Sequence, residues 1–164
     1  MSIILDGNNA TTGGVINVGT AQNSTSGTAI TFTGIPSTAK RIIVMFNNMQ
    51  TSGSSQIQLQ IGSGSVTSSG YTSGASLGSS GYSLTSGFLI VCSAASAHST
   101  NGHSVLTLVG GNTWVESSVI QQAGNYVQLS AGNVSLSGAL DRVVVTTVNG
   151  TDTFTAGSIN IFWE

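Results

Sequence analysis

The scarcity of charged side chains is the feature that most constrains how this chain can fold and stay in solution. Three basic and five acidic residues make up 5% of the sequence, whereas about a quarter of the residues of a typical domain are charged. Apolar residues still reach 39%, which favours an ordered core over a disordered linker. Because chains with so few charges tend to associate, we expect neighbouring molecules to cover much of this surface.

The uncharged residues favour β-structure. Helix formers with long side chains are scarce, whereas Val, Ile and Thr are abundant, and their branched Cβ atoms suit a pleated sheet. Short strand-like segments are separated by turn residues such as Gly110-Gly111-Asn112 and Asn149-Gly150. The sequence therefore predicts an all-β fold, an antiparallel β-sandwich with jelly-roll-like connectivity or, failing that, a barrel.

Several segments carry clear strand signals. Residues 41–46 form a continuous apolar run, which is typical of a central strand covered on both faces. In residues 56–61 Gln alternates with Ile and Leu, so we expect the aliphatic side chains to face the core and the glutamines to face solvent or a partner subunit. Residues 142–147 and 159–163 are predicted to pair as a hairpin across the Asn-Gly turn.

The sequence divides into two parts. Residues 1–26 hold two modest apolar patches, at residues 3–5 and 15–18, and are predicted to form an extended N-terminal arm or short edge strands. Residues 27–164 are predicted to form the β-sandwich domain. Within it, the Gly- and Ser-rich stretch at residues 62–87 is predicted to be a long surface loop with one short strand.

Charge and hydropathy exclude several classes of partner. The only bases are Lys40, Arg41 and Arg142, too few for the basic patch that binds nucleic acid. No apolar run approaches the roughly 20 residues that span a bilayer, so we expect no membrane segment. No signal peptide is recognisable, which predicts synthesis in a cytosol. Cys92, in an apolar segment, is predicted to be a buried free thiol.

Few residues are suited to catalysis. Asp141 precedes Arg142, and Asp152 follows an Asn-Gly turn, so both acids fit turn and ion-pair roles better than a glycosidase pair. His98 and His103 are predicted to be exposed loop residues, because ligands on one strand face lie two residues apart; a metal site shared between chains is the alternative. No nucleophile-elbow sequence occurs. We predict no enzyme activity and no catalytic, cofactor-binding or metal-binding residues.

Four aromatic residues are of interest because aromatic rings stack on sugars. Trp114 and Tyr126 fit core or subunit-interface positions on alternating strands better than a sugar-binding surface. Tyr71 and Tyr82 lie in the Gly- and Ser-rich stretch and are the candidate surface-recognition residues, with a host surface glycan as the possible ligand. This assignment depends on both tyrosines being exposed.

Parts of the chain resemble a known family. Residues 27–46 begin Gly-Thr-Ala-Ile-Thr-Phe-Thr-Gly-Ile-Pro, and residues 136–164 include Leu-Asp-Arg-Val-Val-Val-Thr-Thr-Val-Asn-Gly and end Ile-Asn-Ile-Phe-Trp-Glu. With residues 57–62 and 110–115, they resemble a domain at the C-terminal ends of bacteriophage and prophage tail-fibre-type proteins. The likeness covers roughly residues 27–164 and is loose through the Gly- and Ser-rich stretch. The start, Ile3-Ile4-Leu5-Asp6-Gly7, resembles leader segments of such proteins.

This resemblance implies a virion structural protein, made in the host cytoplasm, that forms a homotrimer and has no catalytic residues. Many relatives carry the domain after a long shaft, whereas here it is nearly the whole chain, so a capsid decoration (head) protein remains an alternative. A lectin-like host-receptor-binding module is another alternative, and the few carboxylates speak against a polysaccharide depolymerase. We expect residues 1–26 to serve either as an attachment segment that contacts other virion proteins or as an element exchanged between subunits of the oligomer. We expect the loops at residues 62–87 and 97–103 to face the host.

Overall fold

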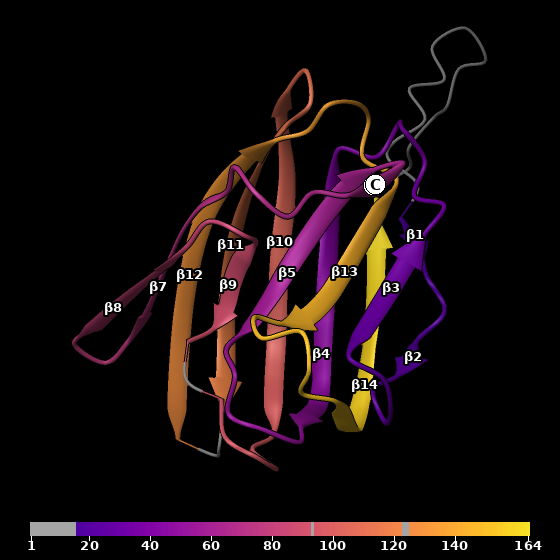
Figure 1. Ribbon diagram of the computed structural model, residues 1–164. Helices are drawn as coiled ribbons and strands as arrows, with labels where there is room; N and C mark the ends of the chain where they lie inside the picture. The colour runs from indigo at the N-terminus through magenta and orange to yellow at the C-terminus, as the bar shows by residue number, and fades with distance from the viewer. Residues whose placement is uncertain (1–15, 93, 123–124) are drawn as a thin grey trace, which may run out of the picture.

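Two antiparallel sheets face each other and enclose one core (Figure 1). The computed structural model describes residues 16–92, 94–122 and 125–164, and no helix occurs among them. In Figure 1 the smaller sheet lies in front of the larger one, so each sheet has an inner face toward the other and an outer face away from it. The predicted all-β antiparallel sandwich is confirmed, and the jelly-roll connectivity stays a prediction.

The larger sheet has nine strands, seven of which form its main body. The two short strands β1 and β2 both pair with the outer edge of β14. In spatial order the strands are β1 (Asn17–Val18) and β2 (Gln22–Asn23), β14 (Phe154–Trp163), β4 (Arg41–Thr51), β10 (Thr100–Gly110), β11 (Thr113–Gln122), β12 (Tyr126–Ser135), β7 (Thr72–Leu77) and β8 (Ser80–Leu84).

The smaller sheet has five strands. Its central strands are β13 and β5, and two short strands, β6 and β9, both pair with β5. In spatial order the strands are β3 (Ala29–Thr33), β13 (Arg142–Thr147), β5 (Ile57–Ser63), and then β6 (Ser65–Val66) and β9 (Phe88–Val91).

The core lies between the two sheets because alternate side chains of each strand point inward. The aliphatic residues of β5 are buried there, as their alternation predicts. The glutamines between them were expected at solvent or a partner and are instead buried under the segment before β9. Gln60 Nε2 donates to the Ser86 carbonyl (2.8 Å), and Ser86 Oγ donates to Gln58 Oε1 (2.9 Å).

The predicted long loop at residues 62–87 is wrong, because this stretch contains β6, β7 and β8. β7 and β8 form a hairpin at the end of the larger sheet, joined by the two residues Gly78 and Ser79. Gly78 has a φ of 59°, which matches the first central position of a type II′ turn. Small residues can form strands when a neighbouring strand supplies the hydrogen bonds, and here β12 does so.

The predicted hairpin between residues 142–147 and 159–163 is also wrong. β13 lies in the smaller sheet between β3 and β5, whereas β14 pairs with β4 in the larger sheet. Both strands carry an apolar face, and placing them in opposite sheets lets both faces enter the same core. Val143 and Ile159 are fully buried from the two sides.

The predicted N-terminal arm is described only in part. Residues 1–15, which hold the patch Ile3-Ile4-Leu5, lie outside the described residues. Residues 16–26 lie along β14, as the alternative of short edge strands predicted, and Ser24 is buried there with its Oγ donating to the Ala156 carbonyl (2.7 Å).

Candidate interaction surface

The outward-pointing side chains of the larger sheet form the surface that we call the outer face. On β4 and β11 the inward residues are buried, so the residues between them point away from the core. The apolar members of the outer face, taken over the six strands β14, β4, β10, β11, β12 and β7, include Ile43, Met45, Val105, Val115, Val119, Val127, Leu129, Ala131 and Phe162.

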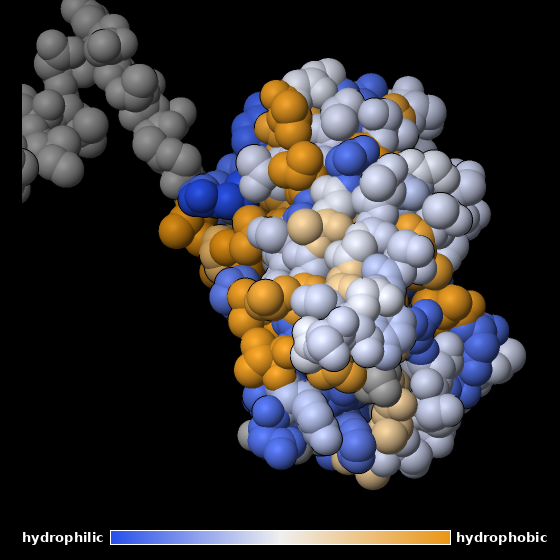
Figure 2. All heavy atoms as spheres, turned by 90° about the vertical axis from the view of Figure 1, so that its left-hand side faces the viewer, coloured by the Kyte–Doolittle hydropathy of each residue, from blue (hydrophilic) through white to orange (hydrophobic). Residues whose placement is uncertain are grey.

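Several of these side chains are strongly exposed. Val119, Leu129 and Val127 are 50%, 52% and 56% exposed, and Val119 lies directly opposite Leu129 in the strand register. In Figure 2 hydrophobic residues gather along the left-hand edge, which is the side of the larger sheet facing away from the viewer in Figure 1. An antiparallel sheet with one solvated face normally alternates apolar and polar residues, so this sheet departs from the solvated pattern.

The outer face carries little charge. Arg41 and Glu164 lie at one end of it and form an ion pair with each other, and the exposed His103 lies on β10 among the apolar residues. Monomeric proteins rarely expose contiguous apolar patches larger than a few hundred Å². The outer face is therefore a candidate interface, and its exposed side chains are mostly apolar or uncharged.

Strand β4 has two apolar faces, but only one of them is covered in the single chain. The sequence predicted that residues 41–46 are covered on both faces. In the chain by itself, Ile42, Val44 and Phe46 are buried in the core, whereas Ile43 and Met45 on the outer face are only half-buried. The predicted second cover is missing from the single chain, and a neighbouring molecule on the outer face would supply it.

The two candidate recognition tyrosines do not form an exposed surface. Tyr71 is 2% exposed, so its predicted exposure is wrong. Its ring packs edge-on against Phe88 with ring centroids 4.9 Å apart, and its hydroxyl accepts from the Ile61 amide (2.9 Å) and lies 3.0 Å from the Thr67 carbonyl, to which it donates. Tyr82 on β8 is half-buried against a small cluster that includes Leu89 and Cys92.

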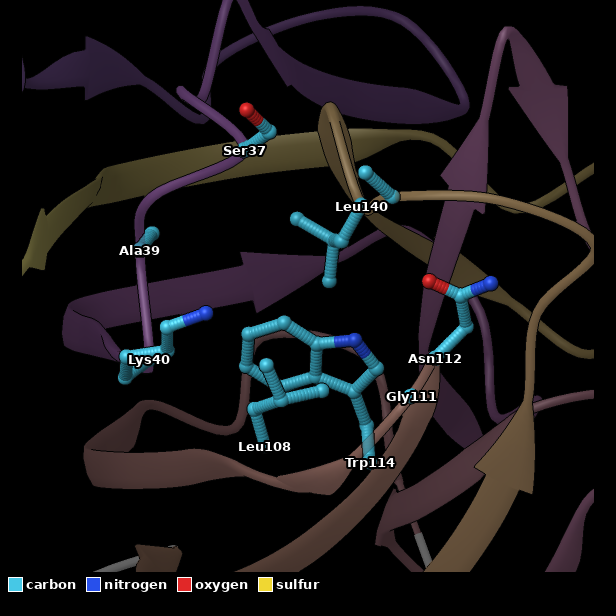
Figure 3. A pocket seen from close by; sticks show the side chains of 9 residues that line it. Ser37, Ala39, Lys40, Leu108, Gly111, Asn112, Trp114 and Leu140 are labelled. Carbon is cyan, nitrogen blue, oxygen red and sulfur yellow. The ribbon is translucent and has the colours of Figure 1, made fainter.

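Trp114 and Tyr126 lie in different environments, and Trp114 lines the pocket in Figure 3. Trp114 is buried, as the core interpretation predicted, whereas Tyr126 is 53% exposed at the start of β12. Trp114 lines a cavity of about 130 Å³ beside the β10–β11 turn, together with Leu108, Leu140 and, at its sides, Lys40 and Asn112 (Figure 3). Neither Tyr71 nor Tyr82 lines this cavity.

Glu116 is a buried acid that sequence reasoning did not single out. It points inward from β11, is 3% exposed, and accepts hydrogen bonds from Ser104 Oγ (2.6 Å) and Ser130 Oγ (3.2 and 3.3 Å). Ser118 Oγ lies 2.6 Å from Ser130 Oγ. Burial raises the pKa of Glu116 to about 7, and the serine hydrogen bonds offset part of that rise. Glu116 lies two residues after Trp114 on β11, so both side chains point to the same side of the strand. Once Trp114 is placed in the core, this spacing predicts that Glu116 is buried as well.

Asp141 and Asp152 lie in loops between strands, as predicted. Asp141 accepts from Arg142 Nε (2.7 Å) and from the Gly64 amide (2.9 Å), and these bonds lower its pKa. Asp152 accepts from Asn149 Nδ2 and the Ser55 amide, both at 2.9 Å, which also lowers its pKa. Both carboxylates thus hold loops in place.

The two histidines lie in different kinds of structure. His98 is exposed in the loop before β10, as predicted, whereas His103 lies within β10 rather than in a loop. Over residues 16–92, 94–122 and 125–164, no group of three or more His, Cys, Asp or Glu is placed to hold a metal ion. Within the same ranges, no helix is long and apolar enough to cross a membrane.

Comparisons with protein-family models, with curated proteins and with solved structures find no match to this chain. The outer face of the larger sheet is therefore the candidate site on its own physical grounds.

Proposed function

We propose that this protein is a structural component of a bacteriophage particle, of the tail-fibre or surface-appendage kind, that works as a homo-oligomer and catalyses no reaction. The observation that carries the oligomeric part is the outer face, where Val119, Leu129 and Val127 are at least half exposed. The particle assignment rests on the resemblance at residues 27–46 and 136–164. The resemblance implies three copies, and residues 1–26 are the proposed link to other virion proteins.

The exposed apolar side chains of the outer face and the low content of charged residues both favour self-association. A protein with 5% charged residues has few side chains that keep apolar surfaces apart in water. Burying apolar surface yields roughly 25 cal/mol per Å², and the charged groups of the outer face are confined to the Arg41–Glu164 ion pair at one end of it. Self-association is thus both the favourable outcome and the means of staying in solution.

The mass of the purified protein tests the oligomeric part. Light scattering on a sizing column should give a multiple of the 16.5 kDa chain, and Val119→Lys should shift the protein toward the monomer because a charge would be buried in the contact. Thr31→Lys is the matched control, since Thr31 is exposed on β3 at the opposite side of the molecule. A wild-type protein that stays at 16.5 kDa at micromolar concentration contradicts the proposal.

The particle assignment needs a separate measurement. Labelling the protein in purified phage particles and imaging them should place it on the tail or on the capsid surface, and the capsid result would favour a decoration protein. A glycan array tests contact with the host surface, with Tyr126 as the exposed aromatic residue to mutate. Absence of the label from intact particles contradicts the proposed role.

A further inference from the structure

The side chains of the outer face change in size from one edge of the sheet to the other. Strand register aligns one row across the seven main strands, and a second row lies two residues away along each strand. The first row, from β14 to β8, is Phe162, Ile43, Val105, Ser117, Ala131, Gly74 and Ser83, and the second is Asn160, Met45, His103, Val119, Leu129, Ser76 and Gly81.

The two edges of these rows differ in shape. The β14 and β4 side carries Phe162, Ile43 and Met45, whereas the β7 and β8 side carries only Gly and Ser. A shallow hollow of about 290 Å³ lies between β12 and β7, lined mainly by Gly74, Ser76 and Ala131 with Leu129 at its wall. One edge of the outer face is therefore raised, and the other is hollowed.

A raised edge and a hollowed edge on one face make that face complementary to itself. Turning a second copy by 180° about an axis parallel to the strands, in the plane between the two faces, reverses the order of strands and leaves their direction unchanged. The raised edge of each copy then meets the hollowed edge of the other, which gives the self-complementary contact of a two-fold dimer. A two-fold axis across the strands would instead set the raised edges against each other.

The middle strand of the seven fixes where this axis lies. The order β14, β4, β10, β11, β12, β7, β8 places β11 at the centre. With the axis above β11, β4 of one copy lies over β7 of the other, so that Ile43 and Met45 enter the hollow at Gly74 and Ser76. Ser117, at the centre of the first row, lies next to its own counterpart.

The size and charge of the outer face suit a second copy. Seven strands at about 4.8 Å spacing span about 29 Å, and outward residues over seven positions of a strand span about 20 Å. The footprint is then about 600 Å² per copy and about 1,200 Å² in total, which lies at the lower end of stable interfaces. Arg41 and Glu164 neutralise each other within one copy, so two copies meet without opposing net charges.

From these observations we infer that the outer face binds a second copy of this chain, sheet against sheet, about a two-fold axis that runs parallel to the strands above β11. The inference rests on the homo-oligomer proposed above and specifies its contact. It predicts a dimer as the basic unit, in place of the three copies that the resemblance implies.

Engineered cysteines distinguish this contact from other arrangements. In the double variant Ile43→Cys/Gly74→Cys the two thiols are four strands apart in one chain, about 19 Å, too far for an internal disulfide. Gly74 accepts a side chain, since its Cβ would lie 3.9 Å from the nearest atom, the Tyr82 carbonyl oxygen. Oxidation should link two chains into a species of twice 16.5 kDa, 33 kDa, on a non-reducing gel.

Single variants serve as controls for the axis. Ser117→Cys alone should also form the 33 kDa species, because Ser117 meets its counterpart near the axis, whereas Ile43→Cys alone should stay a single chain. Self-linking of Ile43→Cys would overturn the inference whether or not Ser117→Cys also links, because an axis parallel to the strands above β11 places Ile43 over Gly74 and not over its own counterpart. The native Cys92 is buried and offers no competing thiol at the surface.

A second variant tests the contact without disulfide chemistry. Gly74→Val fills the hollow and should weaken the dimer at least tenfold, whereas Ala29→Val adds volume on the exposed side of β3 and should leave the dimer unchanged. If the wild type assembles but the cysteine variants do not cross-link and Gly74→Val has no effect, the proposed contact is wrong, whereas the proposed homo-oligomer still stands. A monomeric wild type refutes the proposed assembly itself.

Discussion

Replacing Glu116 by Gln should remove a pH dependence of folding stability that this one carboxyl creates. The folded-state pKa of Glu116 is raised to about 7 from an ordinary value of 4.5, with burial as the main cause. Below pH 4.5 the carboxyl is protonated in both states and has no effect. As the pH rises toward 7, the unfolded chain ionises first, so the free energy of unfolding falls. Above pH 7 both states are ionised and the loss is complete.

The size of this loss follows from the two pKa values. They differ by about 2.5 pH units, and each unit corresponds to about 1.4 kcal/mol, so the wild type should lose about 3 kcal/mol between pH 4.5 and pH 8. In Glu116→Gln the neutral amide keeps the shape, and its oxygen can still accept from Ser104 Oγ. The variant should show little decline over this range and should be more stable than wild type at pH 8.

Urea unfolding followed by tryptophan fluorescence, at one protein concentration and at pH values from 4 to 8, measures both proteins. Asp141 and Asp152 do not interfere, because their lowered pKa values make them contribute stability that is lost only as the pH falls below their ordinary range. A wild-type stability that is flat between pH 4.5 and 7, or a decline that persists in the variant, would refute the assigned role of Glu116.

Three further experiments test the packing of the sandwich. Tyr71→Phe should cost about 1–3 kcal/mol in urea unfolding because the Ile61 amide loses its hydroxyl partner, whereas Tyr82→Phe should change stability by less than about 0.5 kcal/mol. Gly132→Ala should cost at least about 1–3 kcal/mol because the new Cβ collides with the Thr72 carbonyl and lies 3.0 Å from Phe88; a neutral result in a thermal melt contradicts this. Burial raises the pKa of the Cys92 thiol, so a thiol reagent should react with it only after unfolding, and fast labelling of the native protein would show that it is accessible.

Local features of the fold could be read from the sequence. The alternation at residues 56–61 predicted which side chains of β5 enter the core, and the apolar setting of Cys92 predicted its burial. Asp141 and Asp152 hold turns, as their neighbours indicated. Each of these predictions depends on residues within a few positions in the chain, where spacing and turn chemistry leave few alternatives.

Which strands pair with each other, and in which sheet, could not be predicted from local sequence patterns. β13 and β14 are close in sequence and have strong strand patterns, but no local signal says that they belong to different sheets. Tyr71 was misplaced because its Gly- and Ser-rich surroundings suggested a loop, whereas β7, which follows it, gains order from pairing with β12, and β8 pairs with β7 in turn. Glu116 stood in a strand whose inward positions were known only once Trp114 was placed in the core.

The sheet positions of β13 and β14 also affect when the protein can fold during synthesis. β3 and β4 are made early, yet among the described residues the strand that pairs with β3 is β13, and β4 needs β14 along one of its edges. Neither sheet is complete until the last two strands have been translated, and contacts between such distant segments form slowly. Until then the exposed strand edges are open to wrong partners, so the complete sandwich should form only after residues 142–164 have been translated, and removal of these residues should leave both sheets incomplete.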